Sequence, residues 1–592
     1  MRATRDLPLA AALVLLGYAL FFGGGVADGA LPWLGGGALV AVVCSAAALG
    51  VPRGAARLAP LAALVAWLAT TIAWSALPDR SWSYADRTLV YLLLALLGLW
   101  LAPRRQALAL GLGALLGAVA VAALATKVVP TLHDYSLVAR LSAPIGLWNQ
   151  LALLAAFALP LALWRRGVAG ALLAYAWLVA LVLTYSRGGI VTALVVLALW
   201  FWLDEERLRS AATLAAAAVP AAVVVGVAFA LPGVTRSGQS LHTRWVDGGV
   251  FAAVLGVGAA AAAAAALRLT ALTRTHARIA LGVGACAAAA VVAVAVVRGG
   301  GAGELSNGGQ RFTSTSSNFR TVWWRQALDG WRHHVLGGTG GGSFRVTNLR
   351  YRHSSLDNTI EPHDLPLQFG TETGVVGLLL WLLATAALLR GTLRRRGHEL
   401  ALALLLPAFL VHSLVDIDWD FAAVAAPAFV AAGALAGEPR LRRVAPSGAL
   451  VAAGAAVALF LALLMPWLGH RWEGQALSAS LDARSAPRAL SLANRALSVD
   501  PFIAAAYADK AFAAESLGES PRTVFAYYRA AVRREPANPF WWQLAGDYAL
   551  SQRCYRTAYT YLLQYTEREA YGSATQTYNE ARDQVNAGHN NC

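Results

Sequence analysis

The chain has 592 residues, of which 58% are hydrophobic and only 14% are charged, and its mean hydropathy is +0.54. Soluble proteins carry about 25% charged residues, so this composition excludes a soluble enzyme of this length. The glycines follow no period of three and there are only 4 cysteines, which excludes a collagen-like chain and a disulfide-rich secreted scaffold. We therefore expect a polytopic membrane protein.

The chain is strongly basic, with 48 Lys and Arg against 32 Asp and Glu and a formal net charge of +16. Only Lys127 and Lys510 are lysines, so the excess is almost all arginine. Excess arginine can indicate nucleic-acid binding, but in a membrane protein it also marks cytoplasmic loops. The positions of the arginines decide between these two interpretations.

A membrane-spanning helix needs roughly 20 mostly apolar residues, and the sequence offers about fifteen such segments. They lie near residues 7–26, 31–50, 57–76, 87–102, 107–126, 149–164, 170–184, 190–203, 211–231, 249–267, 279–297, 368–389, 399–415, 421–436 and 448–468. The first segment lacks a small-residue cleavage site and leads straight into further apolar segments, so we interpret it as an uncleaved first helix. We expect an all-α, polytopic transmembrane bundle of about 14–15 helices.

Arginines recur in alternate loops between these segments. They are Arg53, Arg57, Arg104, Arg105, Arg165, Arg166, Arg207, Arg209, Arg268, Arg274, Arg278, Arg390, Arg394, Arg395, Arg396, Arg440, Arg442 and Arg443. The positive-inside rule assigns these loops and the N-terminus to the cytoplasm. Topology thus explains most of the basic excess, and we expect no nucleic-acid partner. The loops near 127–148, 186–189 and 232–248, the long loop at 298–367 and the tail after His470 are then extracytoplasmic.

We divide the chain into four regions. Residues 1–297 form an N-terminal transmembrane bundle, 298–367 a long extracytoplasmic loop, 368–468 the C-terminal transmembrane helices, and 469–592 an extracytoplasmic helical tail. In the tail, Arg495-Ala496 recurs 34 residues later as Arg529-Ala530. Helix pairs of this period that end in proline resemble tetratricopeptide repeats, which stack into a curved surface for a protein partner. A helical cap with chance periodicity is the alternative.

Two short segments on the extracytoplasmic side carry arginines that topology does not explain. The turn TYSRGG at residues 184–189 contains Tyr185, Ser186 and Arg187, and its glycines allow a ligand to approach the backbone. Arg140 lies shortly before Asn149, at the start of another helix. Arginine near lipid is costly without a partner, so both arginines are candidates for binding an anion. An interfacial arginine whose side chain reaches water is the alternative interpretation.

The long loop carries the richest polar pattern. Arg320, Trp324 and Trp331 fall at helical spacing, and Arg325 follows on the same segment, which predicts an amphipathic helix on the membrane surface. A glycine-rich stretch at residues 337–342 ends this helix; without a P-loop lysine it is a weak phosphate-binding signal. The loop closes on EPHD at residues 361–364, and Glu372 follows at the start of the next helix.

His363 is a candidate base, because histidine accepts a proton near neutral pH and the loops on the same side carry unexplained arginines. A histidine that merely satisfies a loop hydrogen bond is the alternative. Asp416, Asp418 and Asp420 stand at alternate positions near the outer end of a helix pair. They have the right chemistry for a divalent cation, but we favour an electrostatic role opposite the arginines.

These motifs resemble those of the O-antigen ligase and Wzy-type polymerase superfamily of membrane glycosyltransferases. The resemblance rests on the SRGG turn at 186–189, the Arg320 to Trp324 helix, and His363-Asp364 followed by Gly374-x-x-Gly377. It covers roughly residues 60–440. The position after the histidine departs from the family pattern of Asn, Ser or Gln, since Asp364 stands there. An adjacent carboxylate raises the pKa of a histidine, which bears on its use as a base.

The resemblance implies a GT-C type fold and an inverting, metal-independent transfer of a glycan from a polyprenyl diphosphate carrier to an acceptor hydroxyl. It assigns catalytic roles to His363, Arg187 and Arg320. Substrate binding falls to Arg140, Asn149, Arg325, Tyr185, Ser186, Asp364 and Glu372. No cofactor and no metal are expected. The partners would be the lipid-linked glycan donor, a glycan, lipid or protein acceptor, and membrane lipids.

The shared motifs do not separate the members of this superfamily. A ligase attaches a finished glycan to an acceptor, and this is the reading we favour; a Wzy-type polymerase or a protein O-oligosaccharyltransferase would share the same residues. A transporter of the lipid-linked glycan is a further alternative from another class, and would place charges along a central pathway. A membrane-anchored scaffold whose only function is the repeat tail is a third. The expected location is the bacterial plasma membrane.

Overall fold

The computed structural model describes residues 2–269, 275, 317–439, 441–442, 446–569, 571–572 and 574–589. The spanning segment predicted near 279–297 lies outside these residues, as do Arg274, Arg278, Arg440 and Arg443. The described chain is almost entirely helical. Its strands, β1 (Val51–Pro52) and β2 (Leu441–Arg442), form one short antiparallel pair between two loops.

The helices of the membrane half follow the apolar segments. They are α1 (Arg2–Phe21), α2 (Leu31–Leu49), α3 (Ala59–Thr71), α4 (Pro78–Leu99), α5 (Arg105–Val128), α6 (Trp148–Arg165), α7 (Gly167–Leu183), α8 (Arg187–Leu203), α9 (Arg207–Ala230), α10 (Pro232–Thr235), α11 (Leu241–Arg268), α15 (Leu365–Leu389), α16 (Gly397–Ala403), α17 (Leu405–His412), α18 (Ala422–Ala436) and α19 (Pro446–Ser480). Short 3-10 turns connect them: η1 (Gly23–Gly25), η2 (Asp28–Ala30), η3 (Ala55–Leu58), η4 (Ile72–Trp74), η5 (Ala102–Arg104), η8 (Thr392–Arg394) and η9 (Asp418–Asp420).

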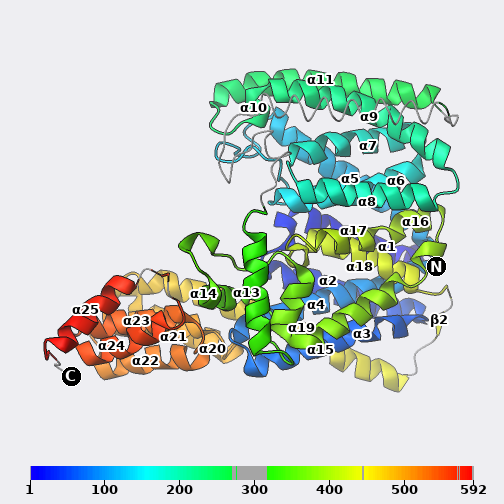
Figure 1. Ribbon diagram of the computed structural model, residues 1–592. Coiled ribbons are helices and arrows are strands. Elements are labelled where there is room, and N and C mark those ends of the chain that lie inside the picture. Colours follow the sequence, from blue (N-terminus) through cyan, green and yellow to red (C-terminus); the bar gives the residue numbers. More distant parts are fainter. Residues whose placement is uncertain are drawn as a thin grey trace.

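Within the described residues, seven helices are long and apolar enough to cross a membrane, and five shorter apolar helices accompany them. The long helices lie side by side in a single bundle (Figure 1). This confirms the predicted all-α polytopic fold. The largest differences from the predicted bounds are at four places. Helix α4 begins at Pro78 rather than near 87, α11 begins at Leu241 rather than near 249, α19 continues to Ser480 rather than ending near 468, and the segment predicted at 399–415 is divided into α16 and α17.

Small residues bring helices α4 and α18 together. A Cβ on Gly433 would lie 2.0 Å from the carbonyl oxygen of Ala95, and a Cβ on Gly98 would lie 2.4 Å from that of Val430. Only glycine fits at these contacts, as is usual where spanning helices approach closely. These contacts hold the second half of α18 against the end of α4, and the Tyr91 hydroxyl on α4 holds the segment before α18 by donating to the Trp419 carbonyl at 2.5 Å.

One end of the bundle, which we call the basic end, is joined by ion pairs between the arginine-rich loops. Arg105 and Arg395 both bind Glu399, at 2.8 and 2.7 Å, and Arg396 binds Glu205 at 2.9 Å. Arg104 pairs in the same way with Asp6 near the N-terminus. These loops were predicted to share one side of the membrane. The C-terminus lies beyond the opposite end, which we call the site end (Figure 1).

At the site end, α13 (Arg320–His333) and α14 (Phe344–Tyr351) cover the bundle, with η7 (Ser355–Asp357) behind them. Helix α13 crosses the ends of the spanning helices (Figure 1). It buries Gln326, Ala327 and Gly330. A Cβ on Gly370 would lie 2.8 Å from the ring of Trp331. The Trp331 ring packs onto α15, where a glycine leaves room for it. The position of this helix at the membrane surface stays a prediction.

The glycine-rich stretch docks into a kink of α15. Gly374 has φ +67°, and a Cβ there would lie 2.0 Å from the carbonyl oxygen of Leu336, so no side chain fits. Gly340 N donates to the Glu372 carbonyl at 2.7 Å, which continues the contact. The glycine-rich stretch, which leads from α13 to α14, is thus held against the backbone of α15.

The tail consists of α20 (Ala486–Val499), α21 (Ala504–Ser516), α22 (Pro521–Arg534), α23 (Pro539–Ser551), α24 (Tyr555–Thr566) and α25 (Thr575–Asn586), after the short turn η10 (Ala483–Ser485). Consecutive helices pack on one another. Helix α19 continues from the bundle into the tail, so the predicted boundary at residue 468 lies inside one continuous helix. The assignment of the tail to the tetratricopeptide family stays a prediction.

Candidate active site

A buried aspartate at the site end joins residues from four parts of the chain. Asp416, between α17 and η9, accepts a hydrogen bond from the Arg320 guanidinium at 3.2 Å and one from the Asn149 side-chain amide. His363 Nδ1 lies 3.6 Å from the other carboxylate oxygen, an ion-pair distance rather than a hydrogen bond. The Asp416 side chain is 2% exposed. It therefore organises a base and a cation at one point.

The charge of Asp416 is kept by its neighbours. Burial alone would raise the pKa of Asp416, but His363, His412 and Arg320 outweigh it and hold the pKa well below its usual range. Asp416 is therefore a fixed anion at neutral pH. Arg320 is fixed further by its Nε, which donates to the Val415 carbonyl at 2.7 Å.

His363 sits in a constrained turn just before α15. Its φ is +56°, in the left-handed region that a side chain rarely adopts. The Trp323 ring stacks on the imidazole with 4.9 Å between centroids. Two residues after His363, Leu365 N donates a hydrogen bond to the Ser413 carbonyl at 2.9 Å. With Nδ1 turned to Asp416, the Nε2 atom is the nitrogen left to face a substrate.

Arg187 opens helix α8 at the turn singled out in the sequence. Ser186 caps the helix, since its hydroxyl accepts from Gly189 N at 3.2 Å. A Cβ on Gly189 would lie 2.3 Å from Ala152 Cβ, so this glycine lets α8 pack directly on α6. Arg187 is half-buried and close enough to Arg320 for their positive charges to repel each other. Two neighbouring guanidinium groups are a ready site for a polyanion.

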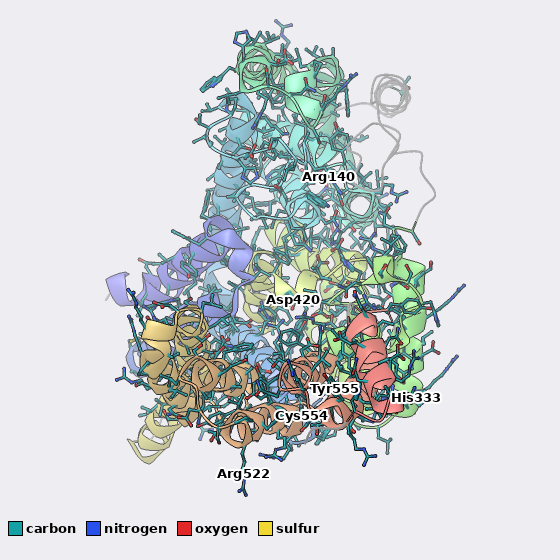
Figure 2. All side chains as sticks on the ribbon, turned by 90° about the vertical axis from the view of Figure 1, so that its left-hand side faces the viewer. Arg140, His333, Asp420, Arg522, Cys554 and Tyr555 are labelled. Carbon is teal, nitrogen blue, oxygen red and sulfur yellow. The ribbon has the colours of Figure 1, made fainter. Side chains whose placement is uncertain are left out.

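Arg140 and Asn149 extend the same network. Arg140 Nε donates to the Thr184 carbonyl at 2.8 Å, and one of its terminal nitrogens lies 3.3 Å from Asn149 Oδ1. Its guanidinium also lies 4.1 Å from the centre of the Trp148 ring. Asn149 donates in turn to Asp416, which lies beside His363. Arg140 is therefore connected to the surroundings of His363 through Asn149 and Asp416. Figure 2, which views the site end, shows Arg140 above Asp420 and the tail below them.

Four other predicted residues make contacts of a different kind. Tyr185 is buried, with φ +54° and its hydroxyl donating to the Thr235 carbonyl at 3.3 Å. Asp364 caps α15 by accepting from Leu367 N at 2.8 Å; burial raises its pKa. Both carboxylate oxygens of Glu372 accept backbone amides of the glycine-rich stretch, at 2.9 and 3.0 Å. Arg325 is exposed on α13, away from the contacts described for Asp416. Their substrate-binding roles stay predictions.

The three alternating aspartates point to three different partners. Asp418 contacts the His412 imidazole at 2.8 Å and the Ser413 hydroxyl at 3.1 Å, and Asp420 accepts from Tyr84 at 2.8 Å. In the part of the chain that the structure describes, no group of three or more His, Cys, Asp or Glu is arranged to hold a metal ion. Asp416 and Asp420 each lie beside an arginine, at 3.2 and 3.8 Å, while the electrostatic role that we favoured for the three aspartates stays a prediction.

The sequence pattern indicated the arginines and the histidine of the site, but it did not indicate that Asp416 connects them. Asp416 was noted only as one of three carboxylates, and nothing local distinguished it from its neighbours. Arg87 and Tyr84 were missed as well, because the first stands at the edge of an apolar run and the second before it. Their partners, Asp28 and Asp420, are distant in sequence.

These features define a polytopic helical membrane protein with a cationic site organised by a buried aspartate. Residues 246–382 match the family model described as O-antigen ligase, a segment that contains Arg320, His363 and Glu372. The match confirms the resemblance seen in the sequence to the O-antigen ligase and Wzy-type family, whose members act on lipid-linked glycans and acceptors in the membrane. It supports a membrane glycosyltransferase-like ligase or polymerase. No curated protein matches the chain.

Proposed function

We propose that the protein transfers a glycan from a polyprenyl diphosphate carrier to an acceptor hydroxyl, with inversion at the anomeric carbon and without a metal. The observation that carries this proposal is the position of Asp416, whose carboxylate lies 3.2 Å from the Arg320 guanidinium and 3.6 Å from His363 Nδ1. Arg187 lies close enough to Arg320 for their charges to interact. A base and a paired guanidinium site at one point suit a hydroxyl nucleophile and a diphosphate leaving group.

In this mechanism His363 Nε2 takes the proton of the acceptor hydroxyl as its oxygen attacks the anomeric carbon. Asp416 faces Nδ1 and stabilises the imidazolium that results. The new bond forms from the acceptor oxygen to the anomeric carbon, and the bond from that carbon to the phosphate oxygen breaks. The carrier diphosphate departs with both electrons of that bond. Arg187 and Arg320 bind its growing charge, so a general acid is not needed.

The remaining cations and polar groups form the surrounding subsite. Arg140 and Asn149 extend it towards the N-terminal helices, and Arg325 gives a further cation on α13. We assign the site end and the tail to the extracytoplasmic side and the basic end to the cytoplasm of a bacterial plasma membrane. The support for this orientation is the positive-inside rule together with the ion pairs that join the arginine loops at one end.

The four-region division of the chain is kept in this proposal, with the loop at 298–367 carrying the base and the tail at 469–592 offering a surface for a protein or glycan partner. A ligase remains the favoured member of the class, because a large extracytoplasmic tail suits a large acceptor. A polymerase or a protein transferase would use the same residues in the same roles.

The test is glycan transfer in reconstituted membranes, with the host's polyprenyl-diphosphate-linked glycan and candidate acceptors, followed by product mass and carrier release. His363→Ala and Arg187→Ala should each abolish transfer, whereas His398→Ala and Arg165→Ala, at the basic end, should not. A single product on a new acceptor would identify a ligase, and a ladder on the carrier a polymerase. No turnover by the wild type with authentic substrates would overturn the proposal and favour transport.

A further inference from the structure

A second buried network lies beside the site and joins α4, α15 and the loop before His363. The Tyr84 hydroxyl lies 2.7 Å from Glu361 Oε1, 2.8 Å from Asp420 Oδ1 and 2.8 Å from Gln368 Nε2. Gln368 Nε2 also donates to Glu361 Oε2 at 2.6 Å. Tyr84, Glu361 and Gln368 are each at most 5% exposed. The Asp420 side chain is 13% exposed, so the three more deeply buried groups depend mainly on one another for their hydrogen bonds.

The donors and acceptors around the Tyr84 hydroxyl do not match if Glu361 and Asp420 are both ionised. A phenol has one O–H donor and two acceptor lone pairs, and an ionised carboxylate only accepts. The Gln368 amide occupies one lone pair of Tyr84, which leaves one donor and one acceptor for two carboxyl groups. If Glu361 and Asp420 were both ionised, one of them would face a phenol lone pair at hydrogen-bond distance. A single proton on one of the two carboxyl groups removes this mismatch and gives each short contact its own hydrogen.

The surrounding charges decide which carboxyl group holds it. Asp420 lies 3.8 Å from Arg87 Nε, and the same guanidinium reaches Asp28 at 3.0 Å, with Arg80 also bound to Asp28. Glu361 has no ion pair within the described residues, and the charged groups nearest to it on α15 and η9 are Glu372 and Asp420. Burial, and then Asp420 and Glu372, raise the pKa of Glu361 well above its usual range, while the Tyr84 hydrogen bond and Arg80 oppose the shift. Burial also raises the pKa of Asp420, but there Arg87 opposes it. The proton belongs on Glu361.

All contacts are satisfied with this single proton. Glu361 Oε1–H donates to the Tyr84 oxygen, Tyr84 O–H donates to Asp420, and the two amide hydrogens of Gln368 go to Tyr84 and Glu361. Glu361 is separated from His363 only by Pro362, whose ring fixes its φ. The left-handed turn at His363 needs support from its surroundings to persist. Glu361 supplies that support from the N-terminal side of the turn, and Leu365 from the other.

We propose that Glu361 is protonated at neutral pH and that its neutral carboxyl group, bonded to Tyr84, is a positioning device for His363 in the transfer reaction. This inference rests on the proposed function. Loss of the proton leaves two anions around one phenol, the contact with Tyr84 is lost, and the His363 turn is released. Transfer should then fall in alkaline solution for a reason that lies outside His363 itself.

The proton can be measured without any activity assay. The infrared difference spectrum between the wild type and Glu361→Gln, both in lipid nanodiscs at pH 7, should show the carbonyl stretch of a protonated carboxylic acid. Labelling the wild type with carboxyl-¹³C glutamate should shift this band to lower wavenumber, whereas labelling with carboxyl-¹³C aspartate should not. A difference spectrum without the band, or a band that shifts with labelled aspartate, would overturn the inference whatever the protein catalyses.

Kinetics test the positioning role. Glu361→Ala should lower kcat about a hundredfold, as small displacements of a catalytic group do, while KM for the donor changes little. Glu361→Gln, a neutral isostere whose amide nitrogen donates and whose oxygen accepts, should retain transfer and lose the alkaline decline of the wild type. Glu567→Gln, exposed in the tail, serves as the control. If Glu361→Gln is as impaired as Glu361→Ala, or declines with pH as the wild type does, the positioning role is wrong. If the wild type transfers nothing, the proposed function fails while the infrared result still stands.

Discussion

Arg352 and Glu569, 217 residues apart, form a buried ion pair between the loop at the site end and the tail. Arg352 donates through Nε at 2.9 Å and through a terminal nitrogen at 2.7 Å to one carboxylate oxygen of Glu569. The same oxygen accepts from Tyr571 N at 3.1 Å. This pair fastens the tail to the end of α14, and the contacts continue towards the site.

From Arg352 the chain of contacts reaches the catalytic turn within a few residues. The next amide, His353 N, donates to Asp357 at 3.3 Å, and the Asp357 carbonyl accepts from the Trp323 indole at 3.0 Å. Trp323 in turn stacks on His363. The tail is thus packed onto the same group of residues that holds the base, which gives it a structural influence on the site.

Removing one partner of this ion pair should cost more than removing both. Glu569→Ala leaves a buried guanidinium unpaired, and we expect it to loosen the tail by about 3 kcal/mol. The double variant Arg352→Leu with Glu569→Leu should recover much of this, because no buried charge remains. Limited proteolysis of the tail in nanodiscs, read together with transfer, measures the effect. The matched control is Glu567→Ala, whose side chain is 54% exposed and lies 3.8 Å from Arg568. Equal loss in the single and double variants would contradict the prediction.

Replacement of Asp416 should affect catalysis at every pH where the protein is folded. Its pKa is held well below the usual range, so its contribution is present above about pH 4 and is lost only as the pH falls further. Asp416→Asn removes the charge that fixes Arg320 and faces His363, and we expect transfer to fall at least about a hundredfold. Between pH 5 and 8, the transfer rate of the wild type should show no change caused by protonation of Asp416.

The control for Asp416 is Asp329→Asn, which breaks an exposed pair with Arg332 on α13. Exposed pairs contribute little, so this variant should transfer as the wild type does. Transfer by Asp416→Asn at the wild-type rate, with the fold intact by thermal unfolding, would show that His363 and Arg320 do not depend on this carboxylate.

Much of the fold could be predicted, because each spanning helix leaves its own apolar run in the sequence. The segments predicted near 107–126 and 170–184 appear as α5 and α7 with ends shifted by a few residues. Such a run is a local property and needs no knowledge of neighbours. The start of α4 was missed because Asp79 and Arg80 make its first turn polar, and that polarity is balanced by Asp28 from another part of the chain.

The candidate site was predictable only as separate pieces. Arg187, Arg320 and His363 stood out as polar residues that topology did not explain, and all three lie in the site region around Asp416. Their connection through Asp416 depends on contacts between residues 96 positions apart in one case and 267 in another. A single sequence gives no sign of such pairings. The cap that Asp364 makes on α15, and the hydrogen bonds that Glu372 accepts from the glycine-rich stretch, likewise depend on the folded backbone.

Gly189→Ala should damage the site through packing. The added Cβ would lie 2.3 Å from Ala152 Cβ, so α8 must move away from α6 and carry Arg187 with it. We expect a loss of transfer of the order of tenfold or more, as for a 1 Å misplacement. Gly226→Ala in α9 is the control, because a Cβ there meets nothing within 4 Å. In a helix that change is neutral or stabilising by about 1 kcal/mol. Donor-dependent transfer and thermal stability, measured for both, separate the two effects, and equal behaviour of the two variants would refute the packing argument.

The junction between tail and bundle should weaken as the pH rises. Burial raises the pKa of Glu535 to about 8 and that of Asp500 to about 6, and Asp79 on α4 adds to both shifts. Burial also raises the pKa of Asp509 to about 8. A raised pKa means that the folded state holds a proton that the unfolded state releases. The stabilisation is therefore complete below about pH 4 and is lost as the pH rises towards 8, by about 1.4 kcal/mol per pH unit for each such group.

Glu535 is buried and accepts hydrogen bonds from the Trp541 indole at 2.6 Å and from the Asn538 side-chain amide at 2.8 Å. When Glu535 loses its proton, a negative charge is therefore left in a buried position. Tryptophan fluorescence during thermal unfolding should show the tail melting earlier at pH 8.5 than at pH 5.5. Glu535→Gln should reduce that difference, since an amide cannot ionise, while Glu580→Gln on the last helix should leave it unchanged. A tail that melts at the same temperature at both pH values, or a Glu535→Gln variant that keeps the full wild-type difference, would show that these carboxyl groups are ionised in the folded protein.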